Sequence, residues 1–207
     1  AAVPAERGFS EGGWCYISSG TWSLMGVELD APIINNRSRE MNFTNEIGVE
    51  GKVRLLKNIM GMWPLQECRR AWESEGHAYS YAELAAMAAA APAFSAVIDP
   101  DAFLEPGHMP ERIARWACEH GEEAPASPGQ FARVILESLA LRYRQVLESL
   151  EELTGHRIGV VHIVGGGSRN ALLNQMVADC ARRTVVAGPD AATAAGNILV
   201  QAKGAGA

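Results

Sequence analysis

Lysine is scarce in this sequence. It occurs only at positions 52, 57 and 203, and the formal net charge of the 207 residues is −6. Because nucleic-acid binding needs clustered lysine and arginine against the phosphate backbone, this composition argues against a nucleic-acid partner. The adjacent pairs Arg69-Arg70 and Arg182-Arg183 are interpreted as solvated helix ends, not as parts of a basic stripe.

The sequence also lacks an uninterrupted hydrophobic run of membrane-spanning length, and no signal peptide opens it. Hydrophobic residues make up 48% of the chain and charged residues 20%, which is enough apolar material for a substantial core. We therefore expect a globular, cytoplasmic protein with no membrane partner, built as one domain of moderate size.

Cysteine is present but lacks any metal-binding spacing. Cys15, Cys68, Cys118 and Cys180 are far apart, with no Cys-x-x-Cys and no neighbouring histidine pair. This arrangement argues against a structural zinc site and predicts no metal ligands. We expect buried, free thiols in a reducing compartment.

The common nucleotide-binding motifs are absent as well. Gly51-Lys52 is followed by Val53 and not by Ser or Thr, which excludes a Walker-type loop. The glycine run 165–167 is followed by Asn170 where a dinucleotide-binding motif requires glycine. No carboxylate lies beside a histidine in a triad-like pattern, so we predict no catalytic group in this chain; Asp190 is interpreted as a helix N-cap.

A strand, a glycine turn and a helix are present between Val160 and Cys180. Five β-favouring residues lead into Gly165, Gly166 and Gly167, and hydrophobic residues then recur at helical spacing. Such a turn lets a ligand approach the backbone closely, next to the positive end of the following helix, which suits a nucleotide. The alternative is a turn that only packs the helix against the sheet, and the spacing alone leaves both open.

A second small-residue turn lies at residues 18–23, with the sequence Ser-Ser-Gly-Thr-Trp-Ser. Its N–H groups and hydroxyls could hold phosphate oxygens. An ordinary turn between two strands would use the same residue types, so this motif is also ambiguous by itself.

The remaining pattern predicts an α/β fold with a mixed sheet, antiparallel at its start and parallel at its end, and helices on both faces. Residues 1–13 are expected to be an irregular lead-in and residues 35–39 a polar connection. Strands are predicted over 14–18, 22–29, 41–47, 49–57, 160–164 and 184–187, and helices over 59–76, 81–91, 111–120, 128–155, 170–182 and 190–202.

Three segments, 16–26, 42–66 and 162–175, resemble the C-terminal half of the FGGY carbohydrate kinases. The segments occur in the right order and cover nearly the whole chain, and the middle one is most similar to family members that phosphorylate L-rhamnulose. The resemblance implies an actin-like ATPase, ribonuclease-H-like domain over residues 1–207, with a helical insertion at about 77–126. It also implies ATP and Mg²⁺ as cofactors.

The resemblance further implies roles for individual residues. Thr21 would contact the ATP phosphates, Gln66 would lie on the nucleotide side, and Asn58 would reach the sugar. The glycine turn would pack against the adenosine, with Asn170 as an adenine contact; the implied ATP-binding residues are Thr21, Gln66, Gly165, Gly166, Gly167 and Asn170.

One family motif is missing from the sequence. The catalytic base of the family is the aspartate of a His-Asp-Thr motif upstream of the Ser-Gly-Thr turn, and no His-Asp-Thr occurs here. We therefore expect a fragment that lacks the N-terminal, sugar-binding kinase domain and is inactive alone, whereas the whole enzyme would make L-rhamnulose 1-phosphate in L-rhamnose catabolism. Two alternatives stay open, a non-catalytic actin-like nucleotide-binding module and an FGGY kinase for another ketose or polyol.

Overall fold

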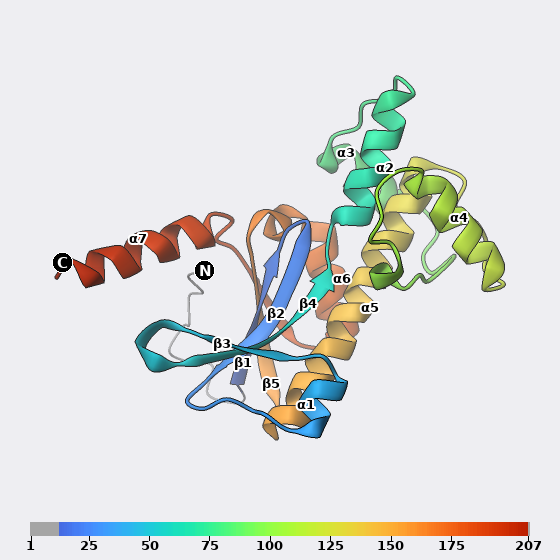
Figure 1. Ribbon diagram of the computed structural model, residues 1–207. Helices are drawn as coiled ribbons and strands as arrows, with labels where there is room; N and C mark the ends of the chain where they lie inside the picture. The colour runs from blue at the N-terminus through green and yellow to red at the C-terminus, as the bar shows by residue number, and fades with distance from the viewer. Residues whose placement is uncertain (1–12, 207) are drawn as a thin grey trace.

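A six-stranded mixed sheet forms the middle of the molecule (Figure 1). The computed structural model describes residues 13–206, so the irregular lead-in expected before residue 13 lies outside the described residues. The strand order is β3-β4-β2-β1-β5-β6, with β5 parallel to both of its neighbours and all other pairs antiparallel. The strands are β1 Gly13–Ser19, β2 Trp22–Leu29, β3 Thr44–Ile47, β4 Val53–Met60, β5 Ile158–Val164 and β6 Thr184–Ala187.

Helices lie on both sides of this sheet, as predicted (Figure 1). The α-helices are α1 Asn36–Glu40, α2 Trp63–Ser74, α3 Tyr81–Ala90, α4 Met109–Glu119, α5 Pro128–Thr154, α6 Ala171–Ala181 and α7 Ala192–Gly204. Short 3-10 helices are η1 Val49–Gly51, η2 Pro100–Ala102 and η3 Gly166–Arg169.

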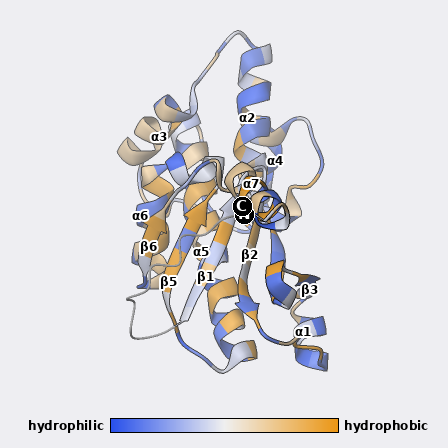
Figure 2. Ribbon diagram, turned by 90° about the vertical axis from the view of Figure 1, so that its left-hand side faces the viewer, coloured by the Kyte–Doolittle hydropathy of each residue, from blue (hydrophilic) through white to orange (hydrophobic). Residues whose placement is uncertain are grey.

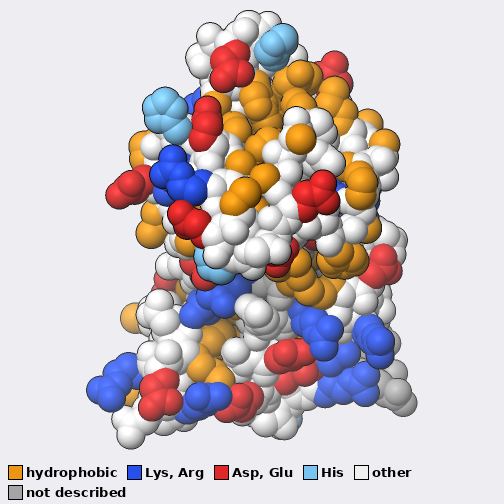
Figure 3. Space-filling model, turned by 90° about the vertical axis from the view of Figure 1, so that its right-hand side faces the viewer, with side chains coloured by type: hydrophobic (Ala, Val, Ile, Leu, Met, Phe, Trp, Pro, Cys, Tyr) orange, Lys and Arg blue, Asp and Glu red, His pale blue; other side chains and the backbone are white. Residues whose placement is uncertain are grey.

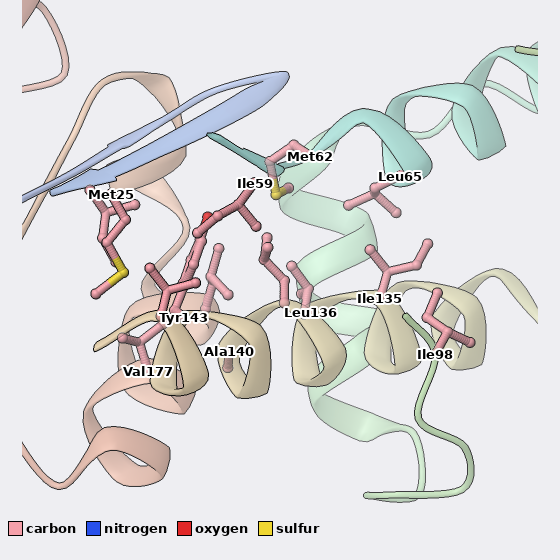
Figure 4. Close-up of a cluster of buried hydrophobic side chains, with 14 of the residues drawn as sticks. Met25, Ile59, Met62, Leu65, Ile98, Ile135, Leu136, Ala140, Tyr143 and Val177 are labelled. Atoms are coloured by element: carbon pink, nitrogen blue, oxygen red, sulfur yellow. The ribbon is translucent and has the colours of Figure 1, made fainter. Parts of the chain in front are cut away.

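The long helix α5 organises the hydrophobic core, and its predicted ends are confirmed. The Ser127 hydroxyl accepts a hydrogen bond from the Gln130 N–H at 3.3 Å, and Gly155 ends the helix with a φ of 71°. One side of α5 faces the sheet and α2, so that Leu136 and Tyr143 point into a cluster with Ile59 and Met25 (Figure 4). Burial of such side chains is the main stabilising term in a domain of this size.

Tyr143 also connects α5 to the start of β2 through a buried hydrogen bond. Its hydroxyl lies 2.6 Å from the Ser23 hydroxyl, and both residues are almost completely buried. Burial raises the pKa of Tyr143, so the phenol stays protonated and can share this hydrogen bond. The contact fixes the turn before β2 against the core.

Hydrophobicity follows this layered arrangement. Figure 2 shows hydrophobic residues concentrated in strands β5 and β6, whereas α1 is mostly hydrophilic. Helix α7 extends from the body on the other side of the sheet, and it exposes Ile198, Leu199 and Val200. Lys203 near its end forms an ion pair with Glu50 of η1. Within residues 13–206, no helix combines the length and hydrophobicity that a membrane crossing requires.

The structure corrects the predicted boundaries around β4. The helix expected from Ile59 begins at Trp63, because Ile59 and Met60 still pair with β2 in the antiparallel ladder. The first part of the strand expected over 49–57 is the 3-10 helix η1. The polar connection expected over 35–39 contains helix α1, which Asn35 caps by accepting a hydrogen bond from the Ser38 N–H at 2.7 Å.

Several side-chain interpretations were also wrong. Asp190 does not cap α7, which begins at Ala192; its carboxylate instead accepts hydrogen bonds from Arg169. Arg183 is not a solvated helix end, since its guanidinium donates to the Ile158 carbonyl and pairs with Glu151 at 3.0 Å. Arg69 likewise donates to a backbone carbonyl.

The four cysteines are free, but they are not all buried. Cys15 and Cys68 are buried, Cys180 is partly exposed and Cys118 is exposed. Helix α4 buries Met109, Ile113 and Ala117 at helical spacing, which turns the neighbouring Cys118 outward.

Replacing Tyr143 with Phe tests the buried hydrogen bond. Tyr143→Phe leaves the Ser23 hydroxyl without this partner in the core, so the free energy of unfolding should fall by about 1–2 kcal/mol. Urea unfolding measures the change, with Tyr79→Phe as the control because Tyr79 is only partly buried. Equal losses in the two variants would show that the Ser23 contact contributes nothing.

Candidate functional site

The two small-residue turns of the sequence lie at the same edge of the sheet. One joins β1 to β2 and the other follows β5, and these strands pair in parallel with Ser18 opposite Val164. Parallel neighbours end at the same edge, so the Ser-Gly-Thr turn and the glycine turn become neighbours. This placement is needed for a shared site.

Close packing explains two of the three glycines in the second turn. A Cβ at Gly165 would lie 2.8 Å from the Ser19 carbonyl oxygen, and Gly165 has a φ of 83°. A Cβ at Gly167 would lie 2.7 Å from the Ser19 Cβ and would overlap its hydroxyl. Real side chains do not approach so closely, so these glycines are required for the turn to pack against β1.

Gly166 has no such packing reason. Among the described residues, no heavy atom lies within 4 Å of the place where its Cβ would be, and its φ is not in the left-handed region. Gly166 instead lines an open cleft. The two interpretations of the glycine run therefore apply to different residues: Gly165 and Gly167 are structural, and Gly166 faces the cleft.

The Ser-Gly-Thr turn is held by the start of α2. The Gly20 carbonyl accepts from the Met62 N–H at 2.9 Å, and the Thr21 carbonyl accepts from the N–H groups of Gly61 and Trp63, each at 3.2 Å. These bonds use N–H groups at the entry to the helix, which helices otherwise leave unpaired. The turn and α2 therefore form one rigid unit beside the glycine turn.

The cleft has a volume of about 710 Å³ and lies between α2, α3 and the start of α6. A volume of this size suits a small-molecule ligand. Its lining residues are Gly20, Met62, Gln66, Tyr81, Ala82, Ala85, Gly166, Gly167, Arg169, Asn170, Ala171 and Leu172. Four predicted ATP-binding residues are thus brought together, namely Gln66, Gly166, Gly167 and Asn170.

Three predicted residues do not line this cleft. Thr21 is exposed on the turn next to Gly20, and Gly165 packs under the turn against Ser19. Asn58 is exposed on β4, opposite Leu24 of β2. Its neighbours Lys57 and Ile59 point to the α5 side of the sheet, so alternation along the strand turns Asn58 to the other face.

Asn170 already has a structural role at the start of α6. Its side-chain oxygen accepts a hydrogen bond from the Leu173 N–H at 3.0 Å and so caps the helix. A ligand contact by Asn170 would therefore use the N–H groups of its side-chain amide. The cap holds this amide at the rim of the cleft, next to the glycine turn.

The electrostatics of the cleft favour an anionic ligand near the glycine turn. Arg169 is the charged residue among those lining the cleft, and its Nε donates to the Asp190 carboxylate at 2.6 Å. This contact holds the pKa of the Asp190 carboxyl below its ordinary value. The N-terminus of α6 adds the partial positive charge of a helix dipole beside Gly166.

Sequence reasoning missed the α3 wall of the cleft. Tyr81, Ala82 and Ala85 come from a helix whose sequence signal was only its Ser80 cap and its alanine content. Long-range packing places α3: a Cβ at Gly129 of α5 would lie 2.8 Å from the Met87 carbonyl oxygen, so the two helices touch closely. No motif in the sequence encodes this contact.

The helical segment that carries α3 and α4 stands above the sheet. Figure 3 shows hydrophobic side chains gathered on the upper part of the face turned to the viewer and charged side chains lower down. Within residues 13–206, no group of three His, Cys, Asp or Glu side chains is arranged to hold a metal ion.

Comparisons with known proteins agree on one family. The family model described as "FGGY family of carbohydrate kinases, C-terminal domain" matches residues 15–205. The Rhamnulokinase of Bacteroides thetaiotaomicron is 50% identical over 205 residues, which are 98% of this chain and 40% of that protein. The Rhamnulokinase of Enterococcus faecalis is 48% identical over 192 residues, 91% of this chain and 38% of that protein.

Among solved structures, xylulose kinase from Rhodospirillum rubrum matches with a TM-score of 0.62 at 20% identity. The match covers 86% of this chain and 35% of that one. It confirms the predicted actin-like α/β fold. The chain spans about 40% of the length of the curated relatives it matches.

A pair of substitutions tests the division of roles among the glycines. Gly167→Ala should lower the free energy of unfolding by about 1–3 kcal/mol, because the new methyl group overlaps Ser19. Gly166→Ala should change it by less than about 0.5 kcal/mol, because its Cβ meets no atom. Urea unfolding of both variants measures the difference, and a larger loss in Gly166→Ala would contradict the assignment.

Proposed function

The chain belongs to the FGGY family of carbohydrate kinases, and we propose that it is the ATP-binding half of a kinase that phosphorylates L-rhamnulose. One observation carries the ATP-binding part of the proposal. The fold gathers Gln66, Gly166 and Asn170 from three separate elements around a single cleft of about 710 Å³. The sequence resemblance implied a nucleotide role for each of these residues before their positions were known.

The residues around the cleft suit the parts of ATP. Gly166 offers bare backbone against which a flat adenosine could pack. Gln66 and Asn170 provide side-chain amides at the rim for hydrogen bonds with the base or ribose. The start of α6 and Arg169 provide positive potential for the phosphates, with Thr21 of the adjacent turn as a phosphate contact.

Phosphoryl transfer depends mainly on positioning and on charge stabilisation. In this proposal, the chain binds and orients the nucleotide, and Mg²⁺ neutralises the phosphate charge. The proton of the sugar hydroxyl would go to the aspartate of a His-Asp-Thr motif, which this sequence does not contain. The catalytic base and most sugar contacts would therefore come from an N-terminal domain.

L-Rhamnulose is proposed as the substrate because the relatives of 41–50% identity bear the name Rhamnulokinase. Asn58, exposed on β4, is the residue of this chain proposed to reach the sugar. The proposal also takes residues 1–207 as one ATP-binding domain, with the helical segment at about 77–126 as an insertion.

Calorimetric titration with ATP and Mg²⁺ tests the proposed nucleotide site. The wild-type chain should bind, and Gly166→Val should abolish binding while leaving the fold intact, because the added side chain enters the cleft without touching other atoms. Gly204→Val is the matched control, since Gly204 also has open space around its Cβ but lies in α7. Binding that survives Gly166→Val would contradict the site.

An activity assay tests the proposed division of labour. The 207-residue chain should release no ADP in a rhamnulose-dependent manner, because the His-Asp-Thr aspartate is absent. Rhamnulose-dependent turnover by this chain would contradict the proposal. Joining the chain to the N-terminal part of a related Rhamnulokinase should restore turnover, and L-xylulose and glycerol serve as comparison substrates.

A further inference from the structure

Helix α3 supplies the only aromatic ring among the residues that line the cleft in the described part of the chain. Tyr81 is the first residue of α3, and 42% of it is exposed to solvent. It lines the cleft together with Ala82 and Ala85 of the same helix, while Gly166, Gly167 and Asn170 line it from the glycine turn. A large side chain at the start of the helix is therefore followed by two small ones.

The ring of Tyr81 is fixed in place by an arginine. The guanidinium carbon of Arg69 lies 4.2 Å from the ring centroid, which is a cation–π contact. Arg69 is itself held, because its Nε donates a hydrogen bond to the Tyr79 carbonyl at 2.7 Å. One face of the ring is thus covered by α2, and the half-exposed side chain keeps the rest of its surface for a ligand.

The small residues beside the ring leave room for a flat group. Ala82 and Ala85 carry only methyl groups, and Gly166 carries no side chain. A planar ring can therefore enter between the start of α3 and the glycine turn without displacing other side chains. An aromatic face next to such a space is the arrangement in which proteins stack bases.

We propose that Tyr81, backed by Arg69, is the platform on which the base of the bound nucleotide stacks. This inference rests on the proposed nucleotide site and adds a binding residue from the helical segment, which none of the sequence motifs contains. The guanidinium draws electron density from the ring, which favours stacking of an electron-rich purine on it. Base stacking does not involve the phosphates, so Tyr81 contributes equally to every nucleotide with the same base.

Calorimetry of ATP and ADP binding, each with Mg²⁺, tests this inference with a set of variants. Tyr81→Ala should weaken the binding of ATP and of ADP by the same factor, about tenfold or more. Tyr81→Phe keeps the ring and should bind both nucleotides within about twofold of the wild type. Met87→Ala is the matched control, because Met87 has a similar exposure of 39% on the same helix but does not line the cleft.

Each outcome decides between the two proposals. Unchanged binding by Tyr81→Ala, a loss for ATP alone, or an equal loss in Tyr81→Phe would overturn the platform and leave the proposed function standing. Absence of ATP and ADP binding in the wild-type chain would overturn the proposed function, and the platform with it. Thermal unfolding of every variant verifies that weak binding does not reflect an unfolded protein.

Discussion

The close contact between Ser19 and the glycine turn is the constraint on which the site depends. Gly165 and Gly167 bring the end of β5 against the end of β1, where any side chain would collide with Ser19. The same segment of chain continues into the Gly20 turn, which the first N–H groups of α2 hold in place. Gly166 is then presented to the cleft, between two glycines whose positions are fixed by packing. The ligand-facing backbone is rigid because its neighbours cannot move.

The core supports this arrangement from below. Tyr143 of α5 shares a hydrogen bond of 2.6 Å with Ser23, at the start of the strand that follows the Gly20 turn. Helix α5 also packs closely against α3 through Gly129 and Met87, so one long helix positions both the turn and the opposite wall of the cleft. Arg169 and Asp190 pair across the mouth of the glycine turn and the approach to α7. A cleft built from sequence segments this far apart requires the whole domain to fold first.

Local sequence signals predicted the elements well where they were strong, and failed where tertiary contacts decide. The strand, glycine turn and helix at residues 160–180, and the Ser127-capped helix, follow from residue types at short spacing. The continuation of β4 through Met60 could not be predicted, because pairing with β2 overrides a helical pattern of hydrophobic residues. Among site residues, Gln66, Gly166, Gly167 and Asn170 were found through motifs. Tyr81 was missed because only the packing of α3 on α5 brings it to the cleft.

A crystal structure of the chain with Mg²⁺ and a non-hydrolysable ATP analogue tests the account most directly. The account predicts the base between the start of α3 and Gly166, and the phosphates toward the N-terminus of α6 and the Gly20 turn. Electron density for the nucleotide elsewhere on the chain, with this cleft empty, would contradict it.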